Sequence, residues 1–64
     1  MSYYKVKSKT SPVVFIEKNP DLVYDSVERI TGDELLAIEA SSWADLATEG
    51  DVYESELFVV EVIE

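Results

Sequence analysis

The stretch of residues 40–53, ASSWADLATEGDVY, constrains the fold more than any other part of the chain. Apolar residues before it recur at helical spacing, whereas those after it alternate as they do in a strand. It also contains Trp43, the only tryptophan. A domain of this size buries only about 60% of the surface that its unfolded chain exposes, so its margin of stability is small. We therefore expect Trp43 to anchor the core, covered by the elements that precede it.

The sequence predicts a helix over about residues 32–47. Thr31 and Glu34 have the spacing of a capping box, and Gly50 can supply the left-handed residue that follows a helix. Glu39 falls inside the apolar stripe of this helix, and we interpret it as a flank residue whose carboxylate reaches water. At about 100° per residue, the stripe collects the apolar side chains. They are Leu35, Leu36, Ala40, Trp43, Leu46 and Ala47.

The first thirty residues predict a β-hairpin followed by a second helix. Tyr3–Ser8 alternates in polarity, and residues 13–17 are β-branched and aromatic, with turn-forming residues between the two segments. Asn19 and Pro20 then suit the cap and the first position of a helix. We predict this helix over about residues 20–29, with a strand as the alternative because valine and tyrosine are weak helix formers.

Residues 52–63 are predicted as one last strand. The chain then forms a single α+β domain over residues 1–64, in the order β-β-α-α-β, with a three-stranded sheet packed by the helices. Lys5 and Lys7 complement Glu54 and Glu56 in charge, which favours placing the first strand beside the last.

The last strand carries apolar side chains on both of its faces. Helices on one side of a three-stranded sheet can cover only one of these faces. The sequence therefore leaves two alternatives: a small, partly open β-barrel with one helix, or an exposed apolar patch that forms a homodimer interface. The residues of the predicted patch are Phe58, Val60 and Val62.

The charge of the chain is unevenly distributed. Residues 1–18 carry a net charge of +3, whereas residues 19–64 carry thirteen acids and only Arg29, a net charge of −12. Such a surface repels nucleic acid and anionic membranes and attracts a basic protein surface, although charge also serves solubility alone. We predict a partner-binding acidic row on the helix, the following turn and the last strand. Its residues are Asp33, Glu34, Asp45, Glu49, Asp51, Glu54 and Glu56.

The residue types present argue against an enzyme. The chain has no Cys and no His, and its two glycines cannot build a phosphate-binding loop. The acids near Gly50 lack the spacing of an EF-hand. We therefore predict no catalytic, metal or cofactor site. The N-terminal lysines precede no apolar run, and no apolar run is long enough to span a bilayer, so we expect a cytoplasmic protein.

The segment SSWADLATEGDVYE, residues 41–54, together with VEVIE at the C-terminus, resembles small uncharacterised acidic proteins of Gram-positive phages and mobile elements. The resemblance covers about the last third of the chain and implies no activity. It favours an accessory protein that binds a basic partner, as an inhibitor or a nucleic-acid mimic. The alternative is a structural module that self-associates.

Overall fold

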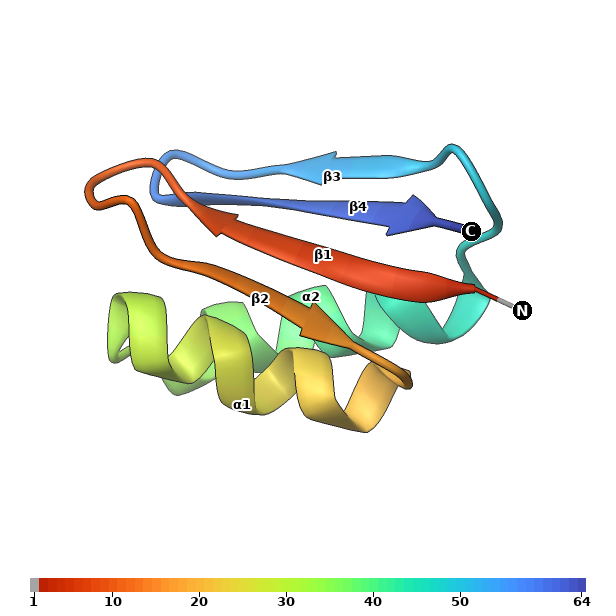
Figure 1. The fold of residues 1–64 in the computed structure, drawn as a ribbon. Helices are drawn as coiled ribbons and strands as arrows, with labels where there is room; N and C mark the ends of the chain where they lie inside the picture. Colours follow the sequence, from red (N-terminus) through yellow and green to blue (C-terminus); the bar gives the residue numbers. More distant parts are fainter. Residues whose placement is uncertain (1) are drawn as a thin grey trace.

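The chain folds into an antiparallel sheet of four strands, with two helices side by side on one face (Figure 1). The computed structural model describes residues 2–64. The strand order in the sheet is β2-β1-β4-β3. The predicted α+β class and the succession of a hairpin, two helices and a C-terminal β segment are confirmed. The elements are β1 (Tyr3–Ser8), β2 (Val14–Glu17), α1 (Pro20–Thr31), α2 (Glu34–Leu46), β3 (Val52–Glu54) and β4 (Phe58–Ile63).

The C-terminal β segment forms a hairpin and not the single strand that was predicted. The chain reverses at residues 55–57, where the amide of Ser55 donates to the carbonyl of Phe58 at 2.9 Å. The sheet therefore has four strands instead of three. The reversal pairs Tyr53 with Val60, which puts Tyr53 on the same face as Phe58. β1 pairs with β4, as predicted for the first and last strands.

Helix α1 forms where it was predicted and extends further, so the alternative of a strand is wrong. The side chain of Asn19 caps it by accepting from the amide of Leu22 at 3.3 Å, and Pro20 takes the first position. Gly32 ends the helix at a φ of 69°, a conformation that glycine adopts without steric cost. Its amide donates to the carbonyl of Glu28 at 2.7 Å.

Helix α2 is capped by Asp33, and the capping box predicted at Thr31 does not form. The Asp33 carboxylate accepts from the amides of Leu35 and Leu36 at 2.9 and 3.3 Å. The Thr31 hydroxyl instead donates to the carbonyl of Val27 within α1. The helix is followed by Ala47 as its C-cap, so Gly50 lies in the later turn and does not cap it.

The core lies between the sheet and the helices. The buried residues contributed by each layer show how it is built. The sheet buries Val6, Phe58, Val60 and Val62; α1 buries Val23 and Val27; α2 buries Ala37, Ala40 and Ala44.

The predicted exposed patch is therefore wrong. Phe58, Val60 and Val62 retain 0%, 0% and 2% exposure because they point toward the helices. The predicted barrel is wrong as well, since the sheet stays open with β2 and β3 at its edges. The face of the sheet that the helices leave uncovered carries the alternate residues of each strand.

The predicted stripe of α2 is correct at its centre and wrong at its ends. Leu35 and Leu46 are 71% and 88% exposed, although the pattern placed both in the core. The small side chains of Ala37, Ala40 and Ala44 are buried instead, which allows α2 to pack closely along α1. Trp43 is half-buried and packs against the core, as predicted.

Candidate interaction surfaces

The predicted acidic row is not one continuous row. Asp33 and Glu34 lie at the start of α2 and Asp45 near its end, whereas Glu54 ends β3 and Glu56 lies in the hairpin turn. Several of these acids have structural partners. The Asp33 carboxylate caps α2, and the Asp51 carboxylate accepts from the amide of Thr48 at 2.9 Å. A single surface thus contains only part of the set.

Glu54 is paired with a basic residue. The ammonium of Lys9 lies 2.7 Å from the Glu54 carboxylate, in an ion pair that is open to water. The hydrogen bond from Lys9, together with its positive charge, lowers the pKa of Glu54 below its usual value. Exposed pairs of this kind contribute little to stability, but this one removes Glu54 from the acids that can attract a partner. Glu49 lies nearby in sequence and accepts from the hydroxyl of Ser2 at 3.3 Å.

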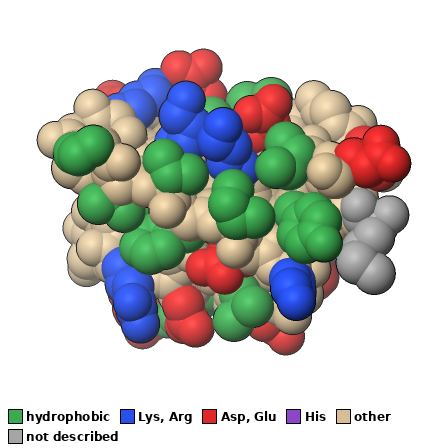
Figure 2. All heavy atoms as spheres, in the orientation of Figure 1, with side chains coloured by type: hydrophobic (Ala, Val, Ile, Leu, Met, Phe, Trp, Pro, Cys, Tyr) green, Lys and Arg blue, Asp and Glu red, His purple; other side chains and the backbone are tan. Residues whose placement is uncertain are grey.

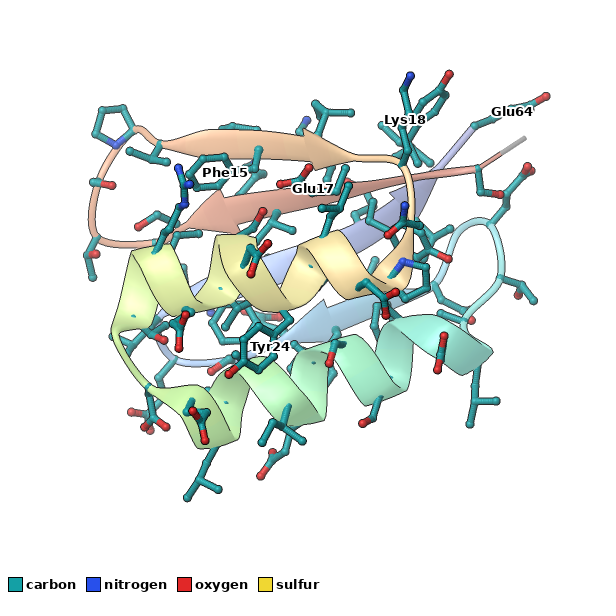
Figure 3. The ribbon with its side chains drawn as sticks, turned by 90° about the horizontal axis from the view of Figure 1, so that it is seen from below. Phe15, Glu17, Lys18, Tyr24 and Glu64 are labelled. Atoms are coloured by element: carbon teal, nitrogen blue, oxygen red, sulfur yellow. The ribbon has the colours of Figure 1, made fainter. Side chains whose placement is uncertain are left out.

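The helical layer carries most of the uncompensated negative charge. Residues 20–46 contain seven acids and one base, Arg29, which gives a net charge of −6. Figure 3 looks directly onto this layer, with α1 and α2 in front of the sheet. α2 has no basic residue, so no charge on this helix compensates its acids.

The outer side of α2 combines this charge with exposed apolar side chains. Leu35, Ile38 and Leu46 are 71%, 44% and 88% exposed. The exposed acids Glu34, Glu39 and Asp45 lie beside them in the sequence of the helix. We call these six residues the α2 outer surface. The sequence pattern missed it because it assigned the two leucines to the core.

Tyrosines at the margins of α2 lie close to its acids. Tyr24 packs against the core, and Figure 3 shows it between the two helices. Partial desolvation raises the pKa of Tyr24, and the carboxylates of Glu28 and Glu34 raise it further. Tyr53 donates to the Glu39 carboxylate at 3.5 Å, so Glu39 is exposed as predicted but is oriented by a neighbour.

A shallow groove of about 200 Å³ lies between β2 and α1. The hydroxyl of Ser26 donates to the Glu17 carboxylate at its base. Phe15, Leu22, Asp25 and Arg29 complete the lining. Ligand pockets commonly measure about 300–1,000 Å³, so this groove is small for a substrate. Because the Ser26 hydroxyl and the Glu17 carboxylate bond to each other, we interpret their role as structural.

The uncovered face of the sheet is the second candidate interaction surface. Val14, Ile16 and Val52 are 47%, 53% and 54% exposed on it. Lys5 and Glu61 lie between them as register partners on the two central strands. Figure 2 shows hydrophobic side chains gathered over β1 and β2, with basic side chains beside them.

Other classes of site receive no support from residues 2–64. Within this described part of the chain, no three acidic, His or Cys side chains are grouped so that they could hold a metal ion. Neither α1 nor α2 is long and apolar enough to cross a membrane. Comparison with protein-family models, curated proteins and solved structures finds no match to this chain.

Proposed function

We propose that this protein binds another protein through the α2 outer surface, and that the surface it recognises is basic. The observation that carries the proposal is the exposure of Leu35 and Leu46 on a helix that has acids but no basic residue. Leu35, Ile38 and Leu46 are exposed along one side of α2, and apolar side chains exposed along one side of an element can form an interface. The carboxylates around them define the charge of the partner.

The two components of the surface would act at different stages of binding. The net charge of −6 over residues 20–46 would attract a basic surface from a distance and accelerate association. Leu35, Ile38 and Leu46 would then be removed from water, which slows dissociation. An apolar centre with a polar rim is the usual arrangement of a specific protein interface.

A finer proposal concerns the kind of partner. Carboxylates fixed on a rigid helix can take the place of phosphates, so a nucleic-acid-binding protein fits this surface well. The resemblance of residues 41–54 to proteins of Gram-positive phages and mobile elements favours a host protein as that partner. Inhibition by mimicry of nucleic acid would follow. We propose this binding role in the cytoplasm, with no catalytic step and no cofactor.

The test begins with identification of the partner by cross-linking and capture from a bacterial lysate. Association and dissociation rates are then measured with the purified partner at low and moderate salt. We expect the double variant Glu34→Gln/Asp45→Asn to associate at least tenfold more slowly than the parent at low salt. The variant Leu35→Ser/Leu46→Ser should associate at the parental rate and dissociate faster.

The matched control is Glu56→Gln/Glu64→Gln, which removes the same charge from exposed positions outside the helical layer. It should bind like the parent. Equal slowing by both double variants would show that net charge alone steers binding. Parental kinetics in both α2 variants would exclude the α2 outer surface as the binding site.

A further inference from the structure

We infer that the uncovered face of the sheet is a homodimer interface, in which Lys5 of each copy pairs with Glu61 of the other. The inference concerns a different surface from the proposed function and does not depend on it. The occupant is a second copy of this chain, because the central row of this face is self-complementary in charge.

The sheet register fixes the pattern. Lys5 on β1 lies opposite Ile16 on β2 and opposite Glu61 on β4. Glu61 lies opposite Val52 on β3. The row across the face therefore reads Ile16, Lys5, Glu61, Val52: apolar, basic, acidic, apolar. Tyr3 and Ile63 form a register pair on one side of this row, and Lys7 and Val59 form one on the other.

A two-fold axis can lie above the uncovered face, parallel to the strands and midway between β1 and β4. Rotation about this axis lays the same row of a second copy over the first in reverse order. It places β1 of one copy over β4 of its partner. Lys5 then faces Glu61 of the second copy, Glu61 faces Lys5, and Ile16 faces Val52 at both edges. In isologous interfaces every contact occurs twice, so this one would have two ion pairs at its centre and one apolar contact at each edge.

The two central charges are available for such pairing. Among residues 2–64, the only ion pair closer than 4.0 Å joins Lys9 to Glu54, so the charged groups of Lys5 and Glu61 are not in direct contact within one copy. Both side chains are half-buried at the centre of the face, where a covering copy would exclude water from them. Twisted sheets pack about 10 Å apart with strands within about 30° of alignment. If the two sheets are rotated by an angle of that size about the centre of the face, Lys5 and Glu61 still lie close to their partners in the second copy.

The distribution of charge selects this face for contact between identical copies. A chain with a net charge of −9 repels its own kind, and the helical layer carries −6 of that charge. The uncovered face carries Lys5 and Lys7 against Glu54 and Glu61, and Lys9 pairs with Glu54 at its margin. It is therefore the side on which two copies can approach with the least repulsion.

The dimer should be weak. Strands about 4.8 Å apart and residues about 3.3 Å apart make the face roughly 15 by 17 Å between backbone atoms. A dimer of this size belongs with interfaces below about 1,200 Å², which are mostly transient. We expect a monomer–dimer equilibrium that is detectable at micromolar to millimolar concentrations.

The experiment uses two variants, Lys5→Glu and Glu61→Lys, and their mixture, measured by sedimentation equilibrium and native mass spectrometry. Each variant alone places like charges at both intermolecular contacts, so each should lose at least tenfold in dimer affinity. In the mixture, the acids of one variant face the lysines of the other at both contacts. A heterodimer should therefore form with about the affinity of the parent dimer. Mixing cannot repair any loss of stability within a chain, so this rescue reports the intermolecular pair alone.

The controls Arg29→Glu and Glu28→Lys make the same charge changes on α1 and should not abolish dimerisation. The parent chain provides an independent measurement. A carbodiimide that joins amines to carboxylates should link Lys5 to Glu61 between isotopically light and heavy copies in a mixed sample. A parent that remains monomeric at about 1 mM would overturn the inference. So would unchanged dimerisation of both variants, or intermolecular cross-links that exclude Lys5 and Glu61.

Discussion

The rings of Trp43 on α2 and Tyr53 on β3 lie 5.4 Å apart between their centroids and are tilted by 47°. Tyr53 in turn stacks on Phe58 of β4 at 5.9 Å. The three aromatic side chains form a bridge from the helical layer to the sheet. Elsewhere, α2 fully buries only alanines and packs the partly buried Leu36 against the core, so this bridge is one of its two large contacts with the rest of the core.

Replacing Trp43 with Ala should destabilise the protein by about 2–3 kcal/mol. This is less than the roughly 3–5 kcal/mol typical of a fully buried aromatic residue, because Trp43 is half-buried. Leu46→Ala, on the same helix, should change the free energy of unfolding by no more than about 0.5 kcal/mol, since Leu46 is 88% exposed. Urea denaturation of the two variants checks this. Equal destabilisation by both would show that the aromatic bridge does not carry the contact.

Ser26→Ala should destabilise the protein by about 1–3 kcal/mol, because it leaves the half-buried carboxylate of Glu17 without its donor. Ser26 itself is buried, with 1% exposure, although the adjoining groove has room for water beside the Glu17 carboxylate. Ser42→Ala, at an exposed position of α2, is the control and should be neutral or slightly stabilising, since alanine is the better helix former. Thermal unfolding of both variants distinguishes these outcomes. A neutral Ser26→Ala would mean that the bond between α1 and β2 contributes nothing.

Stability should fall at alkaline pH. Desolvation and the carboxylate of Glu39 raise the pKa of Tyr53, and similar causes raise that of Tyr24, from the usual value of 10.0. A phenol whose pKa is raised by folding contributes stability that is complete below the unfolded pKa and is lost as the pH rises through the folded one. The melting temperature should therefore decline above about pH 10. Tyr53→Phe should decline less steeply over the same range, and identical slopes would argue against the shift at Tyr53.

Moderate salt should raise the melting temperature. The excess acids, which give the chain its net charge of −9, repel one another more strongly in the folded chain than in the expanded one. Salt screens that repulsion. The ion pair of Lys9 and Glu54 is weakened by the same salt, but it is exposed and contributes little. Lys9→Gln should therefore show a salt response at least as large as that of the parent. A melting temperature that falls with salt in the parent would show that attractive pairs outweigh the repulsion.

The local elements could be predicted because their signals lie within a few residues of sequence. Asn19 and Pro20 mark the start of α1, and alternation marks β1. Even where the cap was assigned to the wrong residue, Thr31 instead of Asp33, the position of α2 changed by only one or two residues. The position of β1 beside β4 followed from complementary charge, although the actual pair to Glu54 comes from Lys9.

Which side of α2 and which side of β4 face the core could not be predicted, because the answer depends on packing between distant segments. A helical pattern gives leucine more weight than alanine, yet the close contact with α1 requires small residues and turns Leu35 and Leu46 outward. The hairpin at residues 55–57 has neither Gly nor Pro, and missing it inverted the assignment of Phe58. The exposed leucines of the α2 outer surface lay on the side that the pattern had assigned to the core, and the face of β4 that was expected to be exposed is the buried one.

The three alanines of α2 have a consequence for how such a protein diversifies. Since this helix contacts the core through its alanines, Leu36 and one tryptophan, most of its remaining positions are free of packing constraints. Substitutions there would accumulate at little cost in stability. Lineages under pressure from changing partners could therefore exchange the outer side of α2 repeatedly while the same sheet and α1 persist. The same freedom makes α2 a suitable position for a randomised library.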